Sequence, residues 1–476
     1  MASRTVPVSS RRHLTRTALI LTALAACAIA AAAGPARAQR LATAAAPAPS
    51  GSLPSPPVVT PGAGPAAGSA ATGVILPPNV DTARVFFDGK ALHDIRLTMK
   101  DGDWETLKAD YLLDTYYPAD FQWRGITIPA IGIKSRGYGS RSGTKPSLRL
   151  DFNRYHENQR FLDLSAMVLS NAVQDTSMLS RRLSMTVFAA MELPAPRIVH
   201  ARLFVNGEYV GLYEAVEAIE KAFLSRAFGW DSTGRKRRND GYLFEYKWDQ
   251  DYDWSYFGAD YARYARLFEP KTHELEAPSV LFGPIDDMMR AINEASDDDF
   301  ESEVGKYLYL AVFIRHLAVE RYVDDRDGFL GDWSVNNFYL YRFEGGTLSA
   351  VIPWDKDFTF YDVYDDIYLG FQNSVMARRI LALPNLRRAF LESLIDCADT
   401  MDQPATPGST ASWLEAQFSR QSAQILDAAR ADIYKPYAYE RVVETHAELL
   451  EYIRGRGAFV RDLAKRELER LPPGVR

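Results

Sequence analysis

Oxygen-bearing side chains are concentrated in one stretch of the chain, where they flank an apolar segment. Four aspartates lie between residues 323 and 332, and Asn336 and Asn337 follow them. The apolar run from Leu348 to Pro353 then leads directly into Asp355. Asparagine and aspartate at the ends of adjacent strands can supply hard oxygen ligands to one magnesium ion from two directions. A solvated acidic loop would explain the aspartates alone, but the apolar run before Asp355 favours a metal site.

A second group of candidate residues lies in a basic loop rich in glycine and serine, at residues 133–147 between two predicted strands. Glycines let the backbone approach a bound group closely, and their N–H groups can form a nest for an anion. Lys145 stands where the second strand begins, so its ammonium group could reach phosphates held under the loop. By itself, the same pattern is also typical of an ordinary hairpin loop.

Motifs of several other functional classes are absent from the sequence. The seven histidines include no pair with HExxH or HxxxH spacing, which leaves a zinc hydrolase with little support. There is no G-x-S-x-G elbow and no G-x-x-x-x-G-K-[ST] loop. Residues 81–476 hold 49 basic and 61 acidic residues, which argues against a nucleic-acid binder because phosphate contacts need clustered cations.

Residues 1–38 predict export to the periplasm or the cell surface. Four arginines precede the apolar run Ala18–Ala33, and an A-x-A cleavage site follows at residues 36–38. The basic segment fits a twin-arginine signal or a Sec signal, and both remain open. Cleavage before Cys27 would make it a lipidated first residue, the only membrane attachment that we predict. Residues 39–80 are dominated by Ala, Pro, Gly and Ser, which predicts a disordered linker.

The folded part, residues 81–476, divides into a β-rich part at 81–275 and a mainly helical part at 276–476. This order predicts an α+β protein with two lobes. The Asn206-Gly207 dipeptide predicts a hairpin. The expected strands are Arg84–Phe87, Ile95–Met99, Ala130–Lys134, Leu148–Phe152, Met167–Leu169, Ile198–Val205, Tyr209–Tyr213 and a β stretch over Asn337–Pro353. The expected helices are Trp104–Leu113, Ser177–Met191, Val280–Ala295, Val304–Arg321, Ser412–Ala429 and Glu440–Leu471.

Taken together, the two groups of residues resemble the CotH kinase family, which is named for a spore-coat protein H and is related to protein kinases. The resemblance runs from about residue 84 to 365 in the family's order. The matching stretches are Ser135–Gly137, Lys145–Ser147, Arg149–Phe152, Leu169–Asn171, Asp175–Ser177 with Arg181, Pro194–Arg197, Val205–Tyr213 with Glu217, Glu269–Thr272, Asp327–Phe329, Asn336–Tyr341 and Ile352–Asp357.

The resemblance implies an exported atypical kinase with a two-lobed fold like that of protein kinases. Such an enzyme transfers the γ-phosphoryl group of ATP to a Ser or Thr hydroxyl of a protein substrate, with Mg²⁺. On the ATP side, it implies that Lys145 holds the α and β phosphates beside Arg136 and Gly137 of the loop. It also implies that Glu217 pairs with Lys145 and fixes its position.

On the metal side, the resemblance implies that Asn337 and Asp355 bind magnesium, with Asp357 as a second carboxylate ligand or as a group that orients the first. Two aspartates compete for the role of accepting the hydroxyl proton. Asp327 fits the family's Asp-Gly-aromatic pattern. Asp332 stands five residues before Asn337, the interval of the protein-kinase D-x-x-x-x-N loop. We prefer Asp327, with Asp332 as the alternative.

Two other classes of protein remain open. Residues 355–359 also read as the D-x-D-x-T signature of an aspartate-nucleophile phosphatase, although that motif should follow the first strand of a doubly wound domain. A catalytically inactive surface-binding protein could use the same fold as a platform. The aromatic cluster at residues 248–264 would then line a recognition surface, although core packing is the explanation that we prefer for it.

Overall fold

Seven strands in the first half of the folded chain close into a barrel, in the order β1-β2-β3-β4-β5-β7-β6. All neighbours are antiparallel except β1 and β6, which close the barrel as a parallel pair. The strands are β1 (His93–Thr98), β2 (Tyr117–Trp123), β3 (Ile126–Ser135), β4 (Leu148–Asp151), β5 (Ala166–Ser170), β6 (Ile198–Val205) and β7 (Glu208–Glu217).

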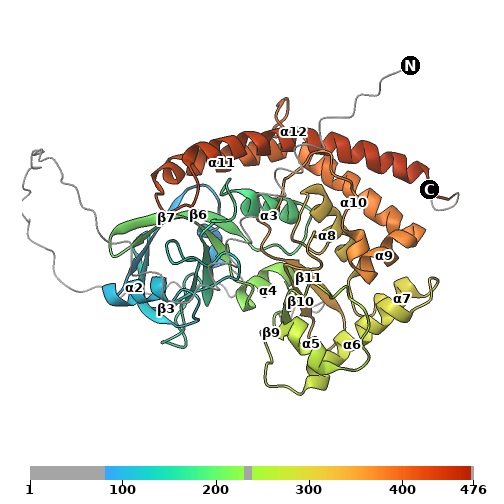
Figure 1. Ribbon diagram of the computed structural model, residues 1–476, viewed down its shortest axis with the longest axis horizontal. Helices are drawn as coiled ribbons and strands as arrows, with labels where there is room; N and C mark the ends of the chain where they lie inside the picture. Colours follow the sequence, from blue (N-terminus) through green and yellow to red (C-terminus); the bar gives the residue numbers. More distant parts are fainter. Residues whose placement is uncertain (1–80, 230–237, 473–476) are drawn as a thin grey trace, which may run out of the picture. The chain divides into compact units, whose positions relative to one another are not determined.

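The structure is a computed structural model that describes residues 81–229 and 238–472. Asp81–Arg476 form one unit of contacts. The predicted signal peptide (1–38), the predicted linker (39–80) and Cys27 lie outside the described residues. Within the unit, a β-rich part precedes a helical C-terminal part (Figure 1), which confirms the predicted α+β class.

A cluster of aromatic rings lies within the otherwise mainly aliphatic core of the barrel. Along β2, alternate side chains point inward, so Phe121 and Trp123 are buried against Phe161 at ring-centroid distances of 4.8 and 5.6 Å. The predicted strand at Arg84–Phe87 is wrong, because Thr82–Val85 form a short 3₁₀ helix. Phe86 still belongs to the barrel core, where its ring packs edge-on against Trp123 and Phe161.

The predicted β6–β7 hairpin is confirmed. Its two turn residues, Asn206 and Gly207, have positive φ angles of 51° and 88°. A two-residue hairpin turn of type I′ needs positive φ at both positions, and asparagine followed by glycine adopts it with little strain.

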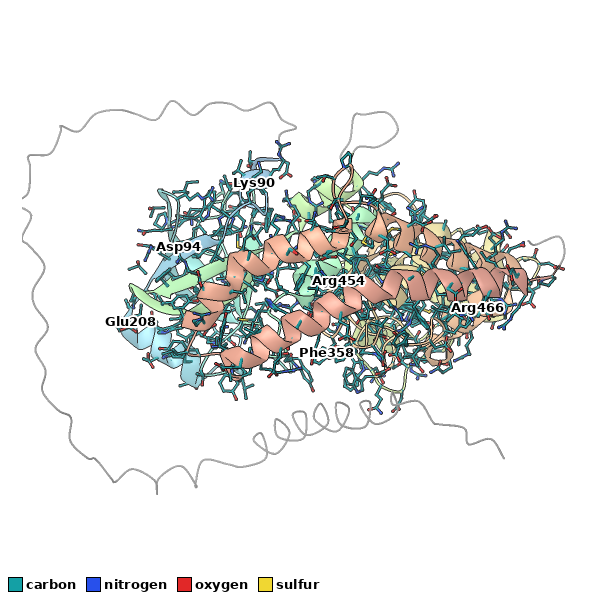
Figure 2. All side chains as sticks on the ribbon, turned by 90° about the horizontal axis from the view of Figure 1, so that it is seen from above. Lys90, Asp94, Glu208, Phe358, Arg454 and Arg466 are labelled. Carbon is teal, nitrogen blue, oxygen red and sulfur yellow. The ribbon has the colours of Figure 1, made fainter. Side chains whose placement is uncertain are left out.

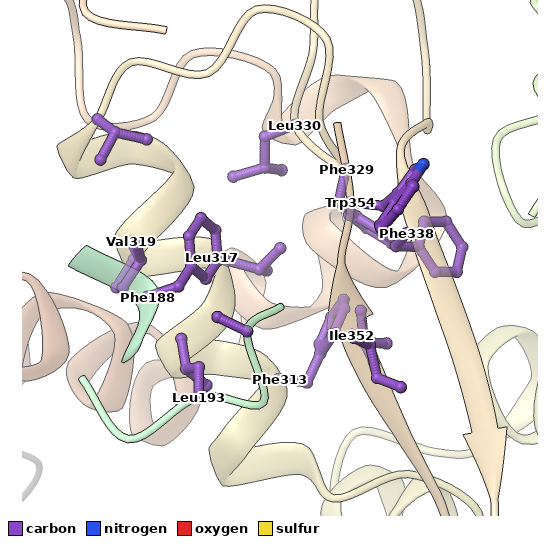
Figure 3. Packing of buried hydrophobic residues seen from close by; sticks show 14 of the residues in the cluster. Phe188, Leu193, Phe313, Leu317, Val319, Phe329, Leu330, Phe338, Ile352 and Trp354 are labelled. Carbon is purple, nitrogen blue, oxygen red and sulfur yellow. The ribbon is translucent and has the colours of Figure 1, made fainter. Parts of the chain in front are cut away.

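A second sheet of four strands, in the order β11-β10-β8-β9, lies among the helices. Its strands are β8 (Tyr242–Tyr246), β9 (Phe268–Pro270), β10 (Phe338–Arg342) and β11 (Ser349–Pro353). Every residue of β10 and β11 is buried, and Phe338 and Ile352 pack in the same core as Phe313 and Phe329 (Figure 3). Because β8 and β9 pair with β10 rather than with the barrel, the predicted boundary at residue 275 does not separate two structural parts.

The helices are α2 (Asp101–Ala109), α3 (Ser180–Ala190), α4 (Lys221–Phe228), α5 (Tyr261–Leu267), α6 (Pro278–Glu294), α7 (Phe300–Val304), α8 (Leu310–Tyr322), α9 (Val375–Ala382), α10 (Pro384–Asp402), α11 (Trp413–Ala431) and α12 (Tyr439–Glu469). The last two run side by side along one face of this unit (Figures 1 and 2). Helix α11 contacts β7 of the barrel, and α12 packs mainly on α10.

No helix in the described part of the chain combines the length and the apolar character that crossing a membrane requires.

Candidate active site

A narrow cleft, partly open to solvent and with a free volume of about 20 Å³, lies where the barrel meets α3 and the end of β11. One part of its wall is apolar and consists of Val168, Met185, Pro196, Ile198 and Val216. The rest is polar apart from one tryptophan, and consists of Arg136, Gly137, Ser140, Ser147, Ser170, Arg181, Trp354 and Asp355. An apolar wall with a few converging polar groups is typical of a small-molecule site, but this cleft is much narrower than such sites usually are.

The glycine-rich loop covers one side of this cleft. Asn171, at the end of β5, donates hydrogen bonds to the carbonyl oxygens of Ser140 (2.9 Å) and Lys145 (2.6 Å) and so fixes both arms of the loop. The Arg136 guanidinium lies 5.5 Å from the centre of the Trp354 ring, a cation–π contact between the loop and the end of β11.

Arg181, on the first turn of α3, is the central cation of the cleft. Its side chain is 7% exposed. One terminal nitrogen donates to Ser170 Oγ and Glu214 Oε2, both at 2.5 Å. The other donates to Asp355 Oδ1 (2.6 Å) and Asp357 Oδ2 (3.0 Å), and Nε also reaches Asp355 Oδ1 (2.9 Å). Burial alone would lower the pKa of Arg181, but the three carboxylates hold it well above its usual value.

The N-terminus of α3 is held by Asp175, which fixes the position of Arg181. Asp175 Oδ2 accepts a hydrogen bond from the Ser180 N–H (2.8 Å), and Oδ1 accepts from the Ser177 N–H (2.9 Å). These bonds satisfy N–H groups that have no partner within the helix.

Burial raises the pKa of Glu214 to about 7, although its partner Arg181 opposes that shift.

Asn337 and Asp355 lie at the same end of the β10–β11 pair. Phe338 is opposite Pro353 in the sheet, and the Trp354 N–H donates to the Asn337 carbonyl oxygen at 3.0 Å. Both residues have a left-handed backbone, with φ of 55° at Asn337 and 49° at Asp355. Residues other than glycine that adopt the left-handed backbone conformation are strained, and such residues are concentrated at functional sites.

Asp327 accepts hydrogen bonds from the side-chain amides of Asn336 (2.9 Å) and Asn337 (2.8 Å). Burial raises its pKa to about 7. The Asn336 amide opposes this shift, whereas the negative charges of Asp325 and Asp355 add to it. Asp327 is therefore electrostatically coupled to the carboxylates around Arg181.

Asp332, the alternative, is more exposed than Asp327. Its side chain is 44% exposed, and the contact that the structure gives it is with Arg326, at 3.4 Å.

The oxygen atoms at this end of the cleft fit a magnesium ion. Both Arg181 contacts to Asp355 use Oδ1, and the Asn337 amide nitrogen is taken by Asp327, so Asp355 Oδ2 and Asn337 Oδ1 are left as donors. Burial and the nearby charges of Asp355 and Asp327 raise the pKa of Asp357 well above its usual value, against the effect of Arg181. A cation would relieve that repulsion.

The described residues contain no cluster of three or more His, Cys, Asp or Glu side chains arranged as a complete metal site. Magnesium does not require one, because it commonly uses one or two protein oxygens together with water and substrate phosphates.

Comparison with known proteins agrees with this geometry. The profile of the family described as CotH kinase protein matches residues 133–460, which include every residue of the cleft. The chain belongs to the CotH kinase family. It is also 25% identical over 374 residues to the inner spore coat protein H of Bacillus subtilis (strain 168), an alignment that covers 76% of this chain and 94% of that protein. The predicted family is confirmed.

In this CotH family member, Lys145 does not reach the cleft. Its side chain is completely buried, and the ammonium group contacts Asp432 Oδ2 (2.7 Å) and the Leu212 carbonyl oxygen (2.9 Å). Burial lowers the pKa of Lys145, against the effect of Asp432. Gly211 is required beside this pair, because a Cβ there would lie 2.7 Å from Asp432 Oδ2 and 2.8 Å from Lys145 Cε. A role for Lys145 in contacting phosphates is not supported by this arrangement.

The predicted pairing of Glu217 with Lys145 is wrong. Glu217 lies at the end of β7 and binds Arg197 (2.7 Å) and Arg226 (2.6 Å), which together lower its pKa despite its burial. The carboxylate that pairs with the cation of the cleft is Glu214, three residues earlier.

The sequence contained a usable signal for Glu214, because it is a single carboxylate within an apolar strand segment, and such a group needs a buried partner. Arg181 belongs to the stretches that resemble the family, but the resemblance implies no role for it.

The phosphatase interpretation of residues 355–359 does not fit the fold. The strand before Asp355 is β11, which belongs to an antiparallel sheet rather than to the parallel, doubly wound sheet that this motif requires. Within the motif, Lys356 is completely buried between Glu320 (2.8 Å) and Asp325 (2.7 Å), and Thr359 hydrogen-bonds to Ser184.

We expect Lys145→Met to destabilise the protein by about 3–5 kcal/mol, because it leaves the buried Asp432 carboxylate without its counter-charge. Urea unfolding measures this change. The double variant Lys145→Met/Asp432→Asn, which removes both charges, should recover part of the loss, because the asparagine oxygen can still accept from the Tyr434 and Lys435 N–H groups. Equal stability of Lys145→Met and the unmodified protein would show that the pair is not formed.

Proposed function

We propose that the protein is a kinase of a cell or spore surface that transfers the γ-phosphoryl group of ATP to a Ser or Thr hydroxyl of a protein. The observation that carries this proposal is the cleft, which has an apolar wall at one side and Arg181 with Asp355 at the other, in a chain of the CotH kinase family. The surface location is proposed from the name of the spore coat relative.

The lining of the cleft supports ATP as the ligand, and the cleft would have to widen to admit it. Val168, Ile198 and Val216 come from three neighbouring barrel strands and would pack against the purine ring. Arg136 and Gly137 lie at the polar part, where the loop would cover the phosphates. In this proposal, the barrel and the helical part act as the two lobes of a kinase-like fold, with the nucleotide between them.

Asp355 and Asn337 would hold magnesium through the two free oxygens described above. When bound, the ion neutralises negative charge on the phosphates as the phosphoryl group moves. Arg181 fixes the orientation of Asp355 and Asp357 and is itself fixed by Glu214. In this proposal, Arg181 and Glu214 form the pair of cation and carboxylate that the resemblance assigned to Lys145 and Glu217.

Asp327 would accept the proton of the substrate hydroxyl as the new bond from oxygen to phosphorus forms. The bond between the γ phosphorus and the bridging oxygen breaks in the same step, and ADP leaves. A pKa near 7 suits a general base at neutral pH. Asp332 remains the alternative.

The test is incubation of residues 81–476 with labelled ATP and Mg²⁺, followed by mapping of the phosphorylated residues. We expect acid-stable, hydroxylamine-resistant phosphate on Ser or Thr, and none when EDTA removes the metal. Hydroxylamine-sensitive phosphate on Asp355 would instead support an aspartate-nucleophile enzyme. An absence of transfer to any protein would favour a non-catalytic surface-binding protein.

A further inference from the structure

A recess of about 500 Å³, partly open to solvent, lies on the outer face of the barrel between β1, β6 and the β2–β3 turn. Three arginines line it: Arg96 on β1, Arg124 in the turn and Arg202 on β6. We propose that this recess binds a phosphorylated side chain of a protein segment and so anchors phosphorylated substrate beside the catalytic cleft. The choice of ligand rests on the proposed kinase function.

The recess carries more positive than negative charge. Asp94, which is labelled on the barrel in Figure 2, is the one carboxylate that lines it. Its Oδ1 accepts from Arg202 Nε at 2.7 Å, and its Oδ2 is 3.8 Å from Arg96. Arg124 makes no ion pair with any residue that the structure describes. Three guanidinium groups therefore face a single carboxylate, in a folded part whose net charge is −12.

Aromatic rings hold two of these guanidinium groups in place. Arg96 lies 4.2 Å from the centre of the Phe204 ring, and Arg124 lies 5.0 Å from the centre of the Trp123 ring. Stacking on a ring restrains the guanidinium plane and leaves its N–H groups free to donate. Arg124 is also held by its turn, in which it and Gly125 have φ of 43° and 82°.

The chemistry of the recess favours a phosphate over a carboxylate. A phosphoserine carries about −1.5 to −2 charges and three strong acceptor oxygens, so it can engage more than one guanidinium group at a time. A glutamate side chain has one charge and two oxygens, and Asp94 already shows how a carboxylate occupies one edge of the recess.

The position of the recess relates it to the cleft. Strand β6 contributes Ile198 to the cleft and Arg202 to the recess, and both side chains lie on the outer face of that strand. The two positions are separated by about 13 Å along the strand, because each residue advances the chain by about 3.3 Å. A protein segment that has received a phosphate in the cleft could therefore be held nearby.

The test uses a short fluorescent peptide with one phosphoserine and measures its binding to the protein by fluorescence anisotropy. We expect the double variant Arg96→Ala/Arg124→Ala to weaken binding by roughly ten- to a hundredfold, because it removes charge-assisted hydrogen bonds. Arg154→Ala is the matched control, since Arg154 is an exposed barrel arginine that also stacks on a ring, that of Tyr116 at 4.4 Å. It should bind the peptide like the unmodified protein.

Three comparisons decide the outcome. The same peptide with unmodified serine or with glutamate should bind at least tenfold more weakly; equal binding would overturn the proposal. Unchanged affinity in Arg96→Ala/Arg124→Ala would overturn it as well. Displacement by inorganic phosphate at a concentration no higher than that of the phosphopeptide would show an adventitious phosphate site and not a peptide site.

The Asp355→Asn variant separates this inference from the proposed function. Its phosphopeptide affinity should equal that of the unmodified protein, because Asp355 lies in the cleft and not in the recess. Phosphopeptide binding without any phosphotransfer by the unmodified protein would support the recess and contradict the kinase. Phosphotransfer without phosphopeptide binding would contradict the recess alone.

Discussion

Asp355→Asn is expected to lower phosphotransfer by roughly two to four orders of magnitude while the fold is retained. The substitution removes the charge of the carboxylate whose Oδ2 is available to a metal ion. Asparagine is close to isosteric with aspartate and tolerates the left-handed backbone of this position, where φ is 49°. Arg181 keeps Glu214 and Asp357 as partners. The measurements are the initial rate with labelled ATP and the melting temperature without nucleotide.

Asp253→Asn is the matched control for this experiment. Asp253 also binds an arginine, Arg378 at 2.8 Å, and its side chain is 35% exposed, compared with 41% for Asp355. It does not line the cleft, so its replacement should leave the rate unchanged within a factor of two. Normal phosphotransfer by Asp355→Asn would contradict the metal-binding role of Asp355.

Arg181→Met is expected to cost about 3–5 kcal/mol of unfolding free energy, because it leaves several carboxylates near one another without their shared cation. Glu214 is buried and the Asp357 side chain is only 7% exposed, and Glu214 Oε1 already has no hydrogen-bond partner in the described part of the chain. Denaturant unfolding measures the effect. Arg181→Lys should restore much of the stability but not the phosphotransfer, because an ammonium group cannot hold all three carboxylates in the planar arrangement of the guanidinium.

Arg441→Met provides the comparison. Arg441 also joins two carboxylates, Glu444 (3.3 Å) and Glu448 (3.1 Å), but its side chain is 38% exposed. Solvent screens such pairs, so this variant should lose no more than about 1 kcal/mol. If Arg181→Met and Arg441→Met unfold at the same denaturant concentration, Arg181 is not the organising cation of the cleft.

Features that depend on nearby residues could be predicted from the sequence. The Asn206-Gly207 turn and the start of α11 after Ser412, whose hydroxyl accepts from the Glu415 N–H, are determined by residues within a few positions of each other. Asn337 and Asp355 could be proposed as magnesium ligands because each lies next to a strand with a strong apolar pattern.

Features that depend on distant residues could not be predicted. Lys145 and Asp432 are separated by 287 residues, and no local pattern indicates that they are in contact. The same limitation affected Glu217, since the choice between Glu214 and Glu217 depends on whether Arg181 or Arg197 lies opposite each side chain. The pairing of β8 with β10 is also long-range, which is why the boundary at residue 275 was misplaced.

The contacts of the α11–α12 turn with the barrel have a consequence for how the protein is made. Asp432 neutralises Lys145, and Tyr437 donates to the carbonyl oxygens of Ala172 and Asp175, which border the segment that carries Arg181. A ribosome releases the barrel residues well before these partners. Until Asp432 has been synthesised, Lys145 of the nascent barrel therefore has no counter-charge. Contacts between residues so distant in the sequence also form slowly. The cleft is completed only late in synthesis, so a chain that is interrupted before the α11–α12 turn should be inactive and prone to degradation.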